Sequence, residues 1–262
     1  MLKSGPKALD RLITKFQVPT LMESQAGLVN WLATPMGQYL FHHEMQISSG
    51  GIFNVPGYRA AQLGISPAHS LLTGLQQEHK LILAPVFDSN AACVCDYQTL
   101  PLPSNTLDVV LLHHALEFSP EPHKLLNEVA RVVAAGGHII IIAFNPFSLF
   151  GFAKWAAGSF STQQVWRHHS LRMARLVDWL QLIGFQIVTA DRGGAMKGMR
   201  DSQINRDRQL SGWIRRRISA GAFFVIVARK QVVPLTPVRQ TRWPPVKVPA
   251  FAGLKTVDKD SA

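Results

Sequence analysis

The chain has 262 residues, of which 47% are hydrophobic, so it is long enough for one large α/β domain with a sizeable core. Its two cysteines, Cys93 and Cys95, would point to opposite faces of an extended strand, which excludes a disulfide scaffold and fits a reducing compartment. The net charge of +11 comes entirely from residues 192–262, which hold 15 Lys and Arg against 4 Asp and Glu, whereas residues 1–191 hold 12 of each.

This charge asymmetry predicts an anionic partner for the C-terminal part, such as RNA or an acidic surface, or else only a solvated basic segment. Within it, Trp213 stands beside Arg215, Arg216 and Arg217, a pattern that suits RNA phosphates or, equally, an amphipathic helix with its basic face in water. The N-terminus does not read as a secretory signal, and no apolar run is long enough to span a bilayer. We therefore expect a cytoplasmic protein without a transmembrane segment.

The chain begins with a basic arm over residues 1–20, followed by a helical cap over residues 21–57. In this cap, apolar residues recur at helical spacing: Leu28, Leu32, Met36 and Leu40. Pro35 must kink or split the helix.

From residue 58 to residue 230, apolar strand patterns alternate with helical patterns. Strands are predicted over 58–64, 80–84, 91–95, 108–114, 138–144, 185–190 and 222–230. Helices are predicted over 68–79, with Ser66 as cap, over 119–135, with Ser119 as cap and Gly136-Gly137 as stop, and over 148–157 and 170–184. This alternation predicts an α/β fold with a mostly parallel sheet and helices on both of its faces. Residues 231–262 form a basic, proline-rich tail that we expect to be disordered.

In an open parallel sheet, a ligand binds beyond the carboxyl ends of the strands, where the strand order reverses. The residues that follow the predicted strands are therefore the candidates for a site. They are polar or small: Gly64 and Ser66, Asp96 and Tyr97, His113 and His114, and Asn145.

The block from Asp96 to Pro146 resembles the class I S-adenosylmethionine-dependent methyltransferases, in particular the small-molecule type-11 group. Asp96 follows a strand, a Leu-Pro-x-Pro turn comes next, and Asp108 opens the fourth strand. The following helix carries Glu128 and Arg131, and a Gly-Gly turn leads to the fifth strand. The resemblance implies a Rossmann-like sheet that ends in an antiparallel C-terminal hairpin.

The resemblance also implies S-adenosylmethionine as cofactor and a role for each candidate. Asp96 would accept a hydrogen bond from the adenine amino group, and Tyr97 would lie against the ring. Gly64 and Ser66 would offer backbone N–H groups to the cofactor carboxylate at a helix start. His113 would border the methionine end, and His114 would be the catalytic base if the acceptor must lose a proton.

Two places depart from the family pattern. The turn after the first strand has only Gly64, with Gln62 where an acidic residue is expected, and the second strand ends in Ala84-Pro85, with Asp88 as the nearest acidic residue. Two hypotheses follow: a methyltransferase acting on an unidentified acceptor, or a catalytically inactive protein of the same fold that recruits an anionic partner such as RNA.

A metal site is the obvious alternative use of the histidines, because His-His pairs stand at 42–43, 113–114 and 168–169. Adjacent residues of a strand face opposite ways, and no Cys-x-x-Cys or His-x-x-x-His spacing completes a ligand set. We therefore expect no metal.

Overall fold

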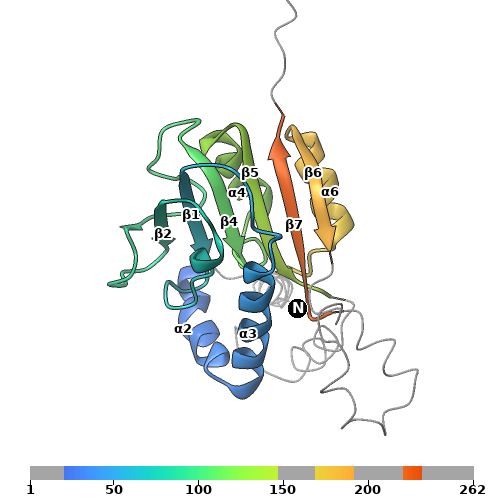
Figure 1. Ribbon diagram of the computed structural model, residues 1–262. Helices are drawn as coiled ribbons and strands as arrows, with labels where there is room; N and C mark the ends of the chain where they lie inside the picture. The colour runs from blue at the N-terminus through green and yellow to red at the C-terminus, as the bar shows by residue number, and fades with distance from the viewer. Residues whose placement is uncertain (1–20, 147–168, 192–220, 232–262) are drawn as a thin grey trace, which may run out of the picture. The chain divides into compact units, whose positions relative to one another are not determined.

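Seven β-strands form one sheet with the order β3-β2-β1-β4-β5-β7-β6 (Figure 1). The computed structural model describes residues 21–146, 169–191 and 221–231. The strands are β1 (Arg59–Gly64), β2 (His79–Ala84), β3 (Cys93–Val94), β4 (Leu107–His113), β5 (Val133–Phe144), β6 (Phe185–Asp191) and β7 (Phe223–Lys230). Every strand predicted from the sequence is therefore confirmed, although β3 is only two residues long.

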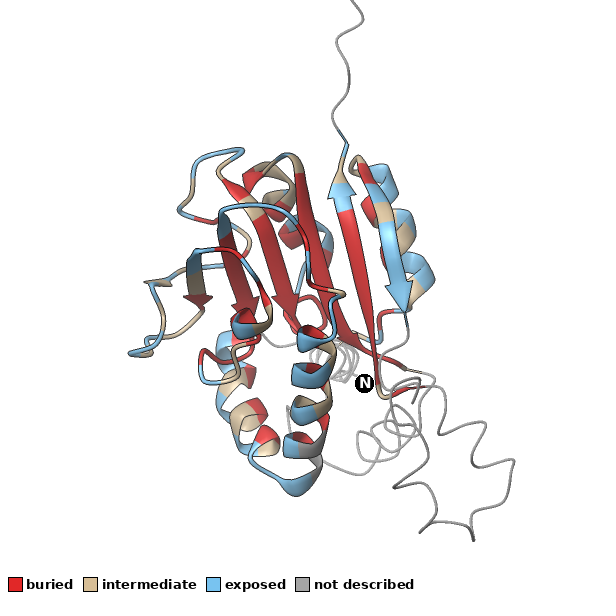
Figure 2. Ribbon diagram, viewed as in Figure 1, coloured by how far each residue is buried: buried red, intermediate tan, exposed pale blue. Residues whose placement is uncertain are grey.

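The five strands β1 to β5 are parallel, and β6 and β7 pair antiparallel with each other at the C-terminal side. The unbroken apolar runs of β4, β5 and β7 are buried, as Figure 2 shows in red. Such runs are typical of strands that are covered on both faces. The predicted Rossmann-like architecture with its antiparallel hairpin is confirmed.

Within residues 21–58, two helices precede the sheet, α2 (Leu21–Leu32) and α3 (Pro35–Ser49), and they meet at the predicted proline. Pro35 stands at the first position of α3, where its missing N–H costs no hydrogen bond. Thr34 is the N-cap, and its hydroxyl oxygen accepts a hydrogen bond from the Gly37 N–H at 3.3 Å. Leu28, Leu32 and Leu40 are buried, as their spacing predicted.

The helix predicted over 68–79 is wrong. The segment holds only a 3₁₀ turn, η1 (Leu72–Gly74), because the Gln62 side chain binds the backbone that a helix would need. Its Oε1 accepts the Leu71 N–H at 2.9 Å, and its amide nitrogen donates to the His69 carbonyl at 3.1 Å. Ser66 caps only a local turn, in which its hydroxyl accepts the Ala68 N–H at 3.3 Å.

Two further helices follow strands of the sheet, α4 (Pro122–Val132) and α6 (Met173–Leu182). The predicted start of α4 at Ser119 is wrong: Glu121 is the N-cap, because a residue before proline avoids the helical conformation. The predicted stop at Gly136-Gly137 is also wrong, since both glycines lie inside β5.

Several residues that carried the family resemblance serve the scaffold. The Asp108 carboxylate accepts the backbone N–H groups of Tyr58 and Arg59 at 2.8 and 2.9 Å and so fixes the start of β1. Glu128 and Arg131 on α4 form an ion pair at 2.7 Å, and both also bind the backbone of Leu100. The Leu-Pro-x-Pro turn is thereby attached to α4.

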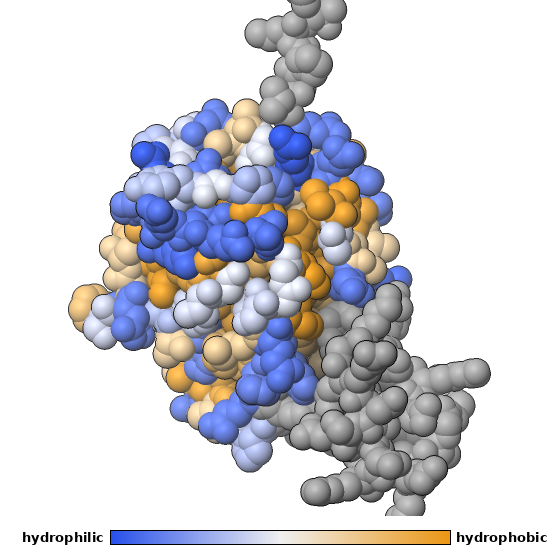
Figure 3. Space-filling model, viewed as in Figure 1, coloured by the Kyte–Doolittle hydropathy of each residue, from blue (hydrophilic) through white to orange (hydrophobic). Residues whose placement is uncertain are grey.

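The described surface mixes hydrophilic residues with apolar ones, which Figure 3 shows as orange areas on the face in view. Exposed apolar side chains include Phe87, Leu182 and Val188. Cys93 and Cys95 are both free thiols, as expected. Among the described residues, no helix is long and apolar enough to cross a membrane.

Several predicted features lie outside the described residues: the N-terminal arm (1–20), the helix over 148–157, the basic segment with Trp213, and the tail from residue 232 onwards.

Candidate functional site

The strand order reverses between β1 and β4, because the chain runs outward from β1 through β2 to β3 and then returns to the other side of β1. Gly64 and His113, the last residues of these two strands, are register partners. Helices α2 and α3 lie at the carboxyl ends of the parallel strands (Figure 1). The place where an α/β sheet binds ligands is therefore bordered by the two N-terminal helices.

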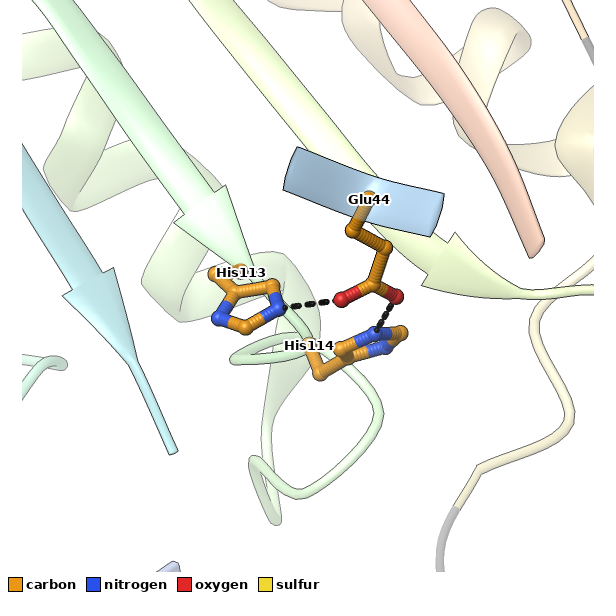
Figure 4. Close-up of side chains that lie close together, drawn as sticks. All are labelled: Glu44, His113 and His114. Atoms are coloured by element: carbon orange, nitrogen blue, oxygen red, sulfur yellow. Dashed lines mark hydrogen bonds and ion pairs between the residues drawn. The ribbon is translucent and has the colours of Figure 1, made fainter. Parts of the chain in front are cut away.

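At this edge, three buried side chains converge from two distant elements (Figure 4). Glu44 of α3 places one carboxylate oxygen 2.9 Å from His113 Nε2 and the other 2.8 Å from His114 Nε2. All three side chains are 0% exposed. The histidine pair predicted at the end of the fourth strand is thus brought together by a glutamate that comes about 70 residues earlier in the chain.

The backbone of His114 explains how both rings reach one carboxylate. His113 ends β4, whereas His114 lies beyond it with a φ of 53°, in the left-handed region that non-glycine residues rarely adopt. The expectation that these neighbours face opposite ways, which rested on both being in the strand, is wrong. Strained backbone of this kind persists only where surrounding contacts fix it.

The charges of this cluster depend on one another. Burial alone would raise the pKa of Glu44, but the charges and hydrogen bonds of His114 and His113 outweigh it and lower the pKa to about 2. Burial alone would lower the pKa of His114, but Glu44 and Glu117 raise it to about 10. At neutral pH the cluster therefore holds a carboxylate and an imidazolium.

Glu117 supports His114 from the other side. Its Oε1 lies 3.4 Å from His114 Nδ1 and also accepts the backbone N–H of Phe144 at the end of β5. The Phe144 ring stacks on the His114 ring, with the centroids 3.9 Å apart. The His114 ring is therefore held by one carboxylate at each nitrogen and by an aromatic face.

Tyr97 lies at the ends of β1 and β2, next to the cluster. Its hydroxyl accepts the Gly64 N–H at 3.2 Å and lies 2.9 Å and 2.7 Å from the carbonyl oxygens of Gly64 and Leu83. The side chain is only 4% exposed, and burial raises its pKa. Gly64, Tyr97 and His113, three of the predicted site residues, are thus brought together.

Asp96 and Ser66 stand apart from this cluster. Asp96 follows β3, is exposed, and accepts the Gln98 N–H at 2.9 Å with one carboxylate oxygen. Ser66 is buried, and its hydroxyl serves the turn after β1. Asp88, the nearest acidic residue after β2, is partly buried and accepts the Asn90 N–H at 2.8 Å in its own turn.

Sequence reasoning missed Glu44 and Glu117. A signal for Glu44 was present, because it follows Leu40 by four residues, about one helical turn, and so falls on the same face of the helix as this apolar residue. A carboxylate on a buried face requires a partner. Glu117 gave no comparable signal.

Comparisons with known proteins match the central part of the chain to methyltransferases. A family model described as "Methyltransferase domain" matches residues 59–141. The chain is 31% identical over 145 residues to the uncharacterized protein YafS of Escherichia coli, covering 55% of this chain and 57% of that protein. It is 27% identical over 100 residues to a phosphatidylethanolamine N-methyltransferase of Cereibacter sphaeroides, covering 38% and 48%. The chain thus spans about half the length of these relatives.

Solved structures share the fold. One is a complex of the Haloferax volcanii Trm112 methyltransferase activator with a putative methyltransferase; the matched chain gives a TM-score of 0.58 at 13% identity, over 80% of this chain and 98% of that one. Another is an S-adenosylmethionine-dependent methyltransferase of Thermotoga maritima, described as a possible histamine N-methyltransferase, with a TM-score of 0.54 at 16% identity, over 74% and 90%.

Proposed function

We propose that the chain is a methyltransferase of the class I type-11 group, which transfers a methyl group from S-adenosylmethionine to an acceptor molecule, because residues 59–141 match the methyltransferase domain model. S-adenosylmethionine is the cofactor of this group. The observation that carries the proposal is the place between β1 and β4 where the strand order reverses, called the switch point. There, small and buried polar residues meet at the carboxyl ends of the strands.

Two observations support a fit. The Asp96 carboxylate is exposed at the carboxyl end of β3, where it can accept a hydrogen bond from an adenine amino group. At the switch point, His113 Nδ1 is buried and has no hydrogen-bond partner within residues 21–146, 169–191 and 221–231. A buried polar atom of this kind is expected to bind a ligand or a water molecule.

The ribose side departs from the family pattern. β2 ends in Ala84 without an acidic residue, and Gln62 binds the turn that follows β1. The Tyr97 hydroxyl is already engaged by backbone groups of β1 and β2, so we propose that Tyr97 shapes the pocket floor rather than offering its hydroxyl to the cofactor. The Gly64 N–H and carbonyl are both bound by the same hydroxyl, so Gly64 contributes through its lack of a side chain, and Ser66 through its backbone.

When bound, the cofactor supplies an electrophilic methyl group on a sulfonium. The role of the chain is to bind and align the two reactants, and alignment alone supplies a large part of the rate enhancement in such reactions. His113 and His114 border the place where the acceptor would meet the methyl group.

His114 stays our candidate for a base, but its partners restrict that role. An imidazole can take up a proton only in its neutral form, and with a pKa of about 10 the neutral form of His114 is the minor one at neutral pH. The geometry therefore favours a positioning role for His114. An acceptor that already presents a free lone pair would need no base at all.

Calorimetric titration of the full chain with S-adenosylmethionine and with S-adenosylhomocysteine tests the proposal. We expect both ligands to bind most tightly to the wild type, less tightly to Asp96→Asn and least tightly to Asp96→Ala. Asparagine loses the charge but keeps the oxygen that caps the turn, whereas alanine loses both. Loss of a hydrogen bond to a charged group should weaken binding by about 10- to 100-fold in Asp96→Ala. Asp178→Ala, which changes an exposed carboxylate on α6, is the control and should bind like the wild type.

Absence of binding of both ligands to the folded wild-type chain would contradict the proposal and favour the catalytically inactive alternative, which the comparisons do not support. Equal weakening by Asp96→Ala and Asp178→Ala would contradict the role of Asp96. Unfolding curves of each variant separate a lost contact from a lost fold.

A further inference from the structure

The side chains of Glu44, His113 and His114 also form a set of metal-ligand groups, and this use of them does not depend on the cofactor. One carboxylate and two imidazoles each offer a ligand atom, and these atoms all lie within 4.8 Å of one another. Imidazole nitrogen and carboxylate oxygen are the ligands that Zn²⁺ and related divalent ions take in proteins, and three such ligands leave a fourth position open. Here all three come from buried side chains (Figure 4).

The backbone conformation of His114 brings its ring to the same carboxylate as His113, which a regular strand would not do. With an ordinary extended conformation, His114 would point away from His113. Its φ of 53° instead turns the ring so that its Nε2 faces the same carboxylate that His113 faces. A strained residue at the end of a strand, next to a buried carboxylate, is typical of a functional site.

A supporting carboxylate stands behind one of the two imidazoles. Glu117 lies at His114 Nδ1, the nitrogen opposite the one that faces Glu44. Metal-bound histidines usually donate their other ring N–H to a carboxylate or a carbonyl, which fixes the tautomer and the orientation of the ring. Glu117 is itself held by the backbone N–H of Phe144.

Charge balance gives a further reason. Two carboxylates, Glu44 and Glu117, lie in a place where neither they nor the two imidazoles are exposed to solvent. Each buried charge costs several kcal/mol, roughly, unless it is neutralised nearby. One divalent cation with two neutral imidazoles neutralises both carboxylates.

We propose that Glu44, His113 and His114 bind a divalent transition-metal ion, with zinc as the representative, at the carboxyl end of β4, and that Glu117 orients His114 in this site. The ion joins helix α3 to the sheet. In the metal-bound state His114 is a ligand, so it takes no part as a base. The proposal does not depend on cofactor binding.

The test uses the full chain without a polyhistidine tag, purified without chelator. We expect about one equivalent of zinc by elemental mass spectrometry, and a single zinc site when the metal-free protein competes with a chromophoric chelator. Glu44→Gln and His113→Gln should remove this site. Glu117→Gln should weaken zinc binding by about 10- to 100-fold, as expected for an orienting partner of a ligand. The matched control is His42→Gln, which changes an exposed histidine on the same helix and should bind zinc like the wild type.

A metal-free wild-type protein that fails to compete with the chelator for zinc or cobalt would overturn the proposal, since the three residues would then be a hydrogen-bonded cluster only. Equal loss of zinc in His42→Gln would also overturn it. If the ligand variants do not fold, X-ray absorption of the zinc-loaded wild type decides: imidazole scattering with Zn–N distances of about 2.0–2.1 Å supports the site. A shell of oxygen atoms without imidazole contradicts it. All of these measurements are made without S-adenosylmethionine, so their failure and the failure of the proposed function are distinguishable.

Discussion

Tyr97 is a single side chain whose hydroxyl group joins two strands, through Gly64 of β1 and Leu83 of β2. In Tyr97→Phe the Gly64 N–H and the Leu83 carbonyl would lose a buried partner, which should lower the free energy of unfolding by about 1–3 kcal/mol. Urea unfolding curves measure this. Tyr58→Phe is the control, because the Tyr58 side chain is largely exposed, and it should change the free energy by less than about 0.5 kcal/mol. Equal effects of the two changes would contradict the bridging role of Tyr97.

The Glu44 and His114 pair predicts a pH dependence of stability in the metal-free protein. The folded pKa of His114 is raised from 6.5 to about 10, so its stabilisation is complete below pH 6.5 and is lost as the pH rises toward 10. The folded pKa of Glu44 is lowered from 4.5 to about 2, so its stabilisation is present above pH 4.5 and is lost as the pH falls. The pair therefore stabilises the fold most between about pH 4.5 and about pH 6.5.

We expect the free energy of unfolding of the chelator-treated protein to fall by about 1–2 kcal/mol from about pH 6 to about pH 8.5, measured by urea unfolding. In Glu44→Gln, His114 loses its main charged partner, and this part of the pH dependence should shrink. An unchanged pH profile in Glu44→Gln would contradict the pairing.

Single residues also show where sequence reasoning succeeds and fails in the site. The position of Asp96 and His113 at the carboxyl edge of the sheet was predictable, because each stands at the end of an apolar run. Glu44 was not found, because only the folded chain brings α3 to the end of β4. The orientation of His114 was mistaken because one left-handed residue reverses the strand alternation.

At the scale of elements, the start of α3 rests on one residue, Thr34, whose side chain accepts the Gly37 N–H. Thr34→Ala should lower the free energy of unfolding by about 1 kcal/mol, the usual cost of losing an N-cap. Ser49→Ala, which changes an exposed hydroxyl at the other end of the same helix, is the control and should have a smaller effect. If both variants unfold at the same urea concentration as the wild type, Thr34 does not act as a cap.

Elements were predictable wherever one apolar pattern decided them. The buried runs of β4 and β5 have the pattern of central strands, and Pro35 was expected to kink or split the helical pattern in which it stands. The segment after β1 also had a helical pattern, with a cap signal at Ser66. There the competing hydrogen bonds came from Gln62, inside the preceding strand, and no local pattern reveals them.

The same segment also packs closely against α3. A side chain at Gly74 in η1 would place its Cβ 2.7 Å from Ser48 of α3. Helix α3 therefore approaches the very segment in which the sequence predicted a helix of its own.

At the scale of the whole molecule, stability should be unequal across the sheet. β4 and β5 are buried over most of their length, whereas β3 has two residues at an edge, neither of them buried. Amide hydrogen exchange should therefore be slowest at 109–112 and 139–142, where exchange requires global unfolding, and much faster at 93–95. Mass spectrometry of exchanged peptides measures the difference. Equal protection of β3 and β4 would contradict this order.

The contact between Glu44 and His114 spans 70 residues, and this has a consequence for synthesis on the ribosome. At translation rates of about 5–20 residues per second, α3 emerges several seconds before the end of β4 exists. During that time the histidines that pair with the Glu44 carboxylate have not been synthesised. Most of the core that buries the leucines of α2 and α3 is missing as well. The nascent helices α2 and α3 are therefore a stretch of this chain that we expect chaperones to bind before β4 is made.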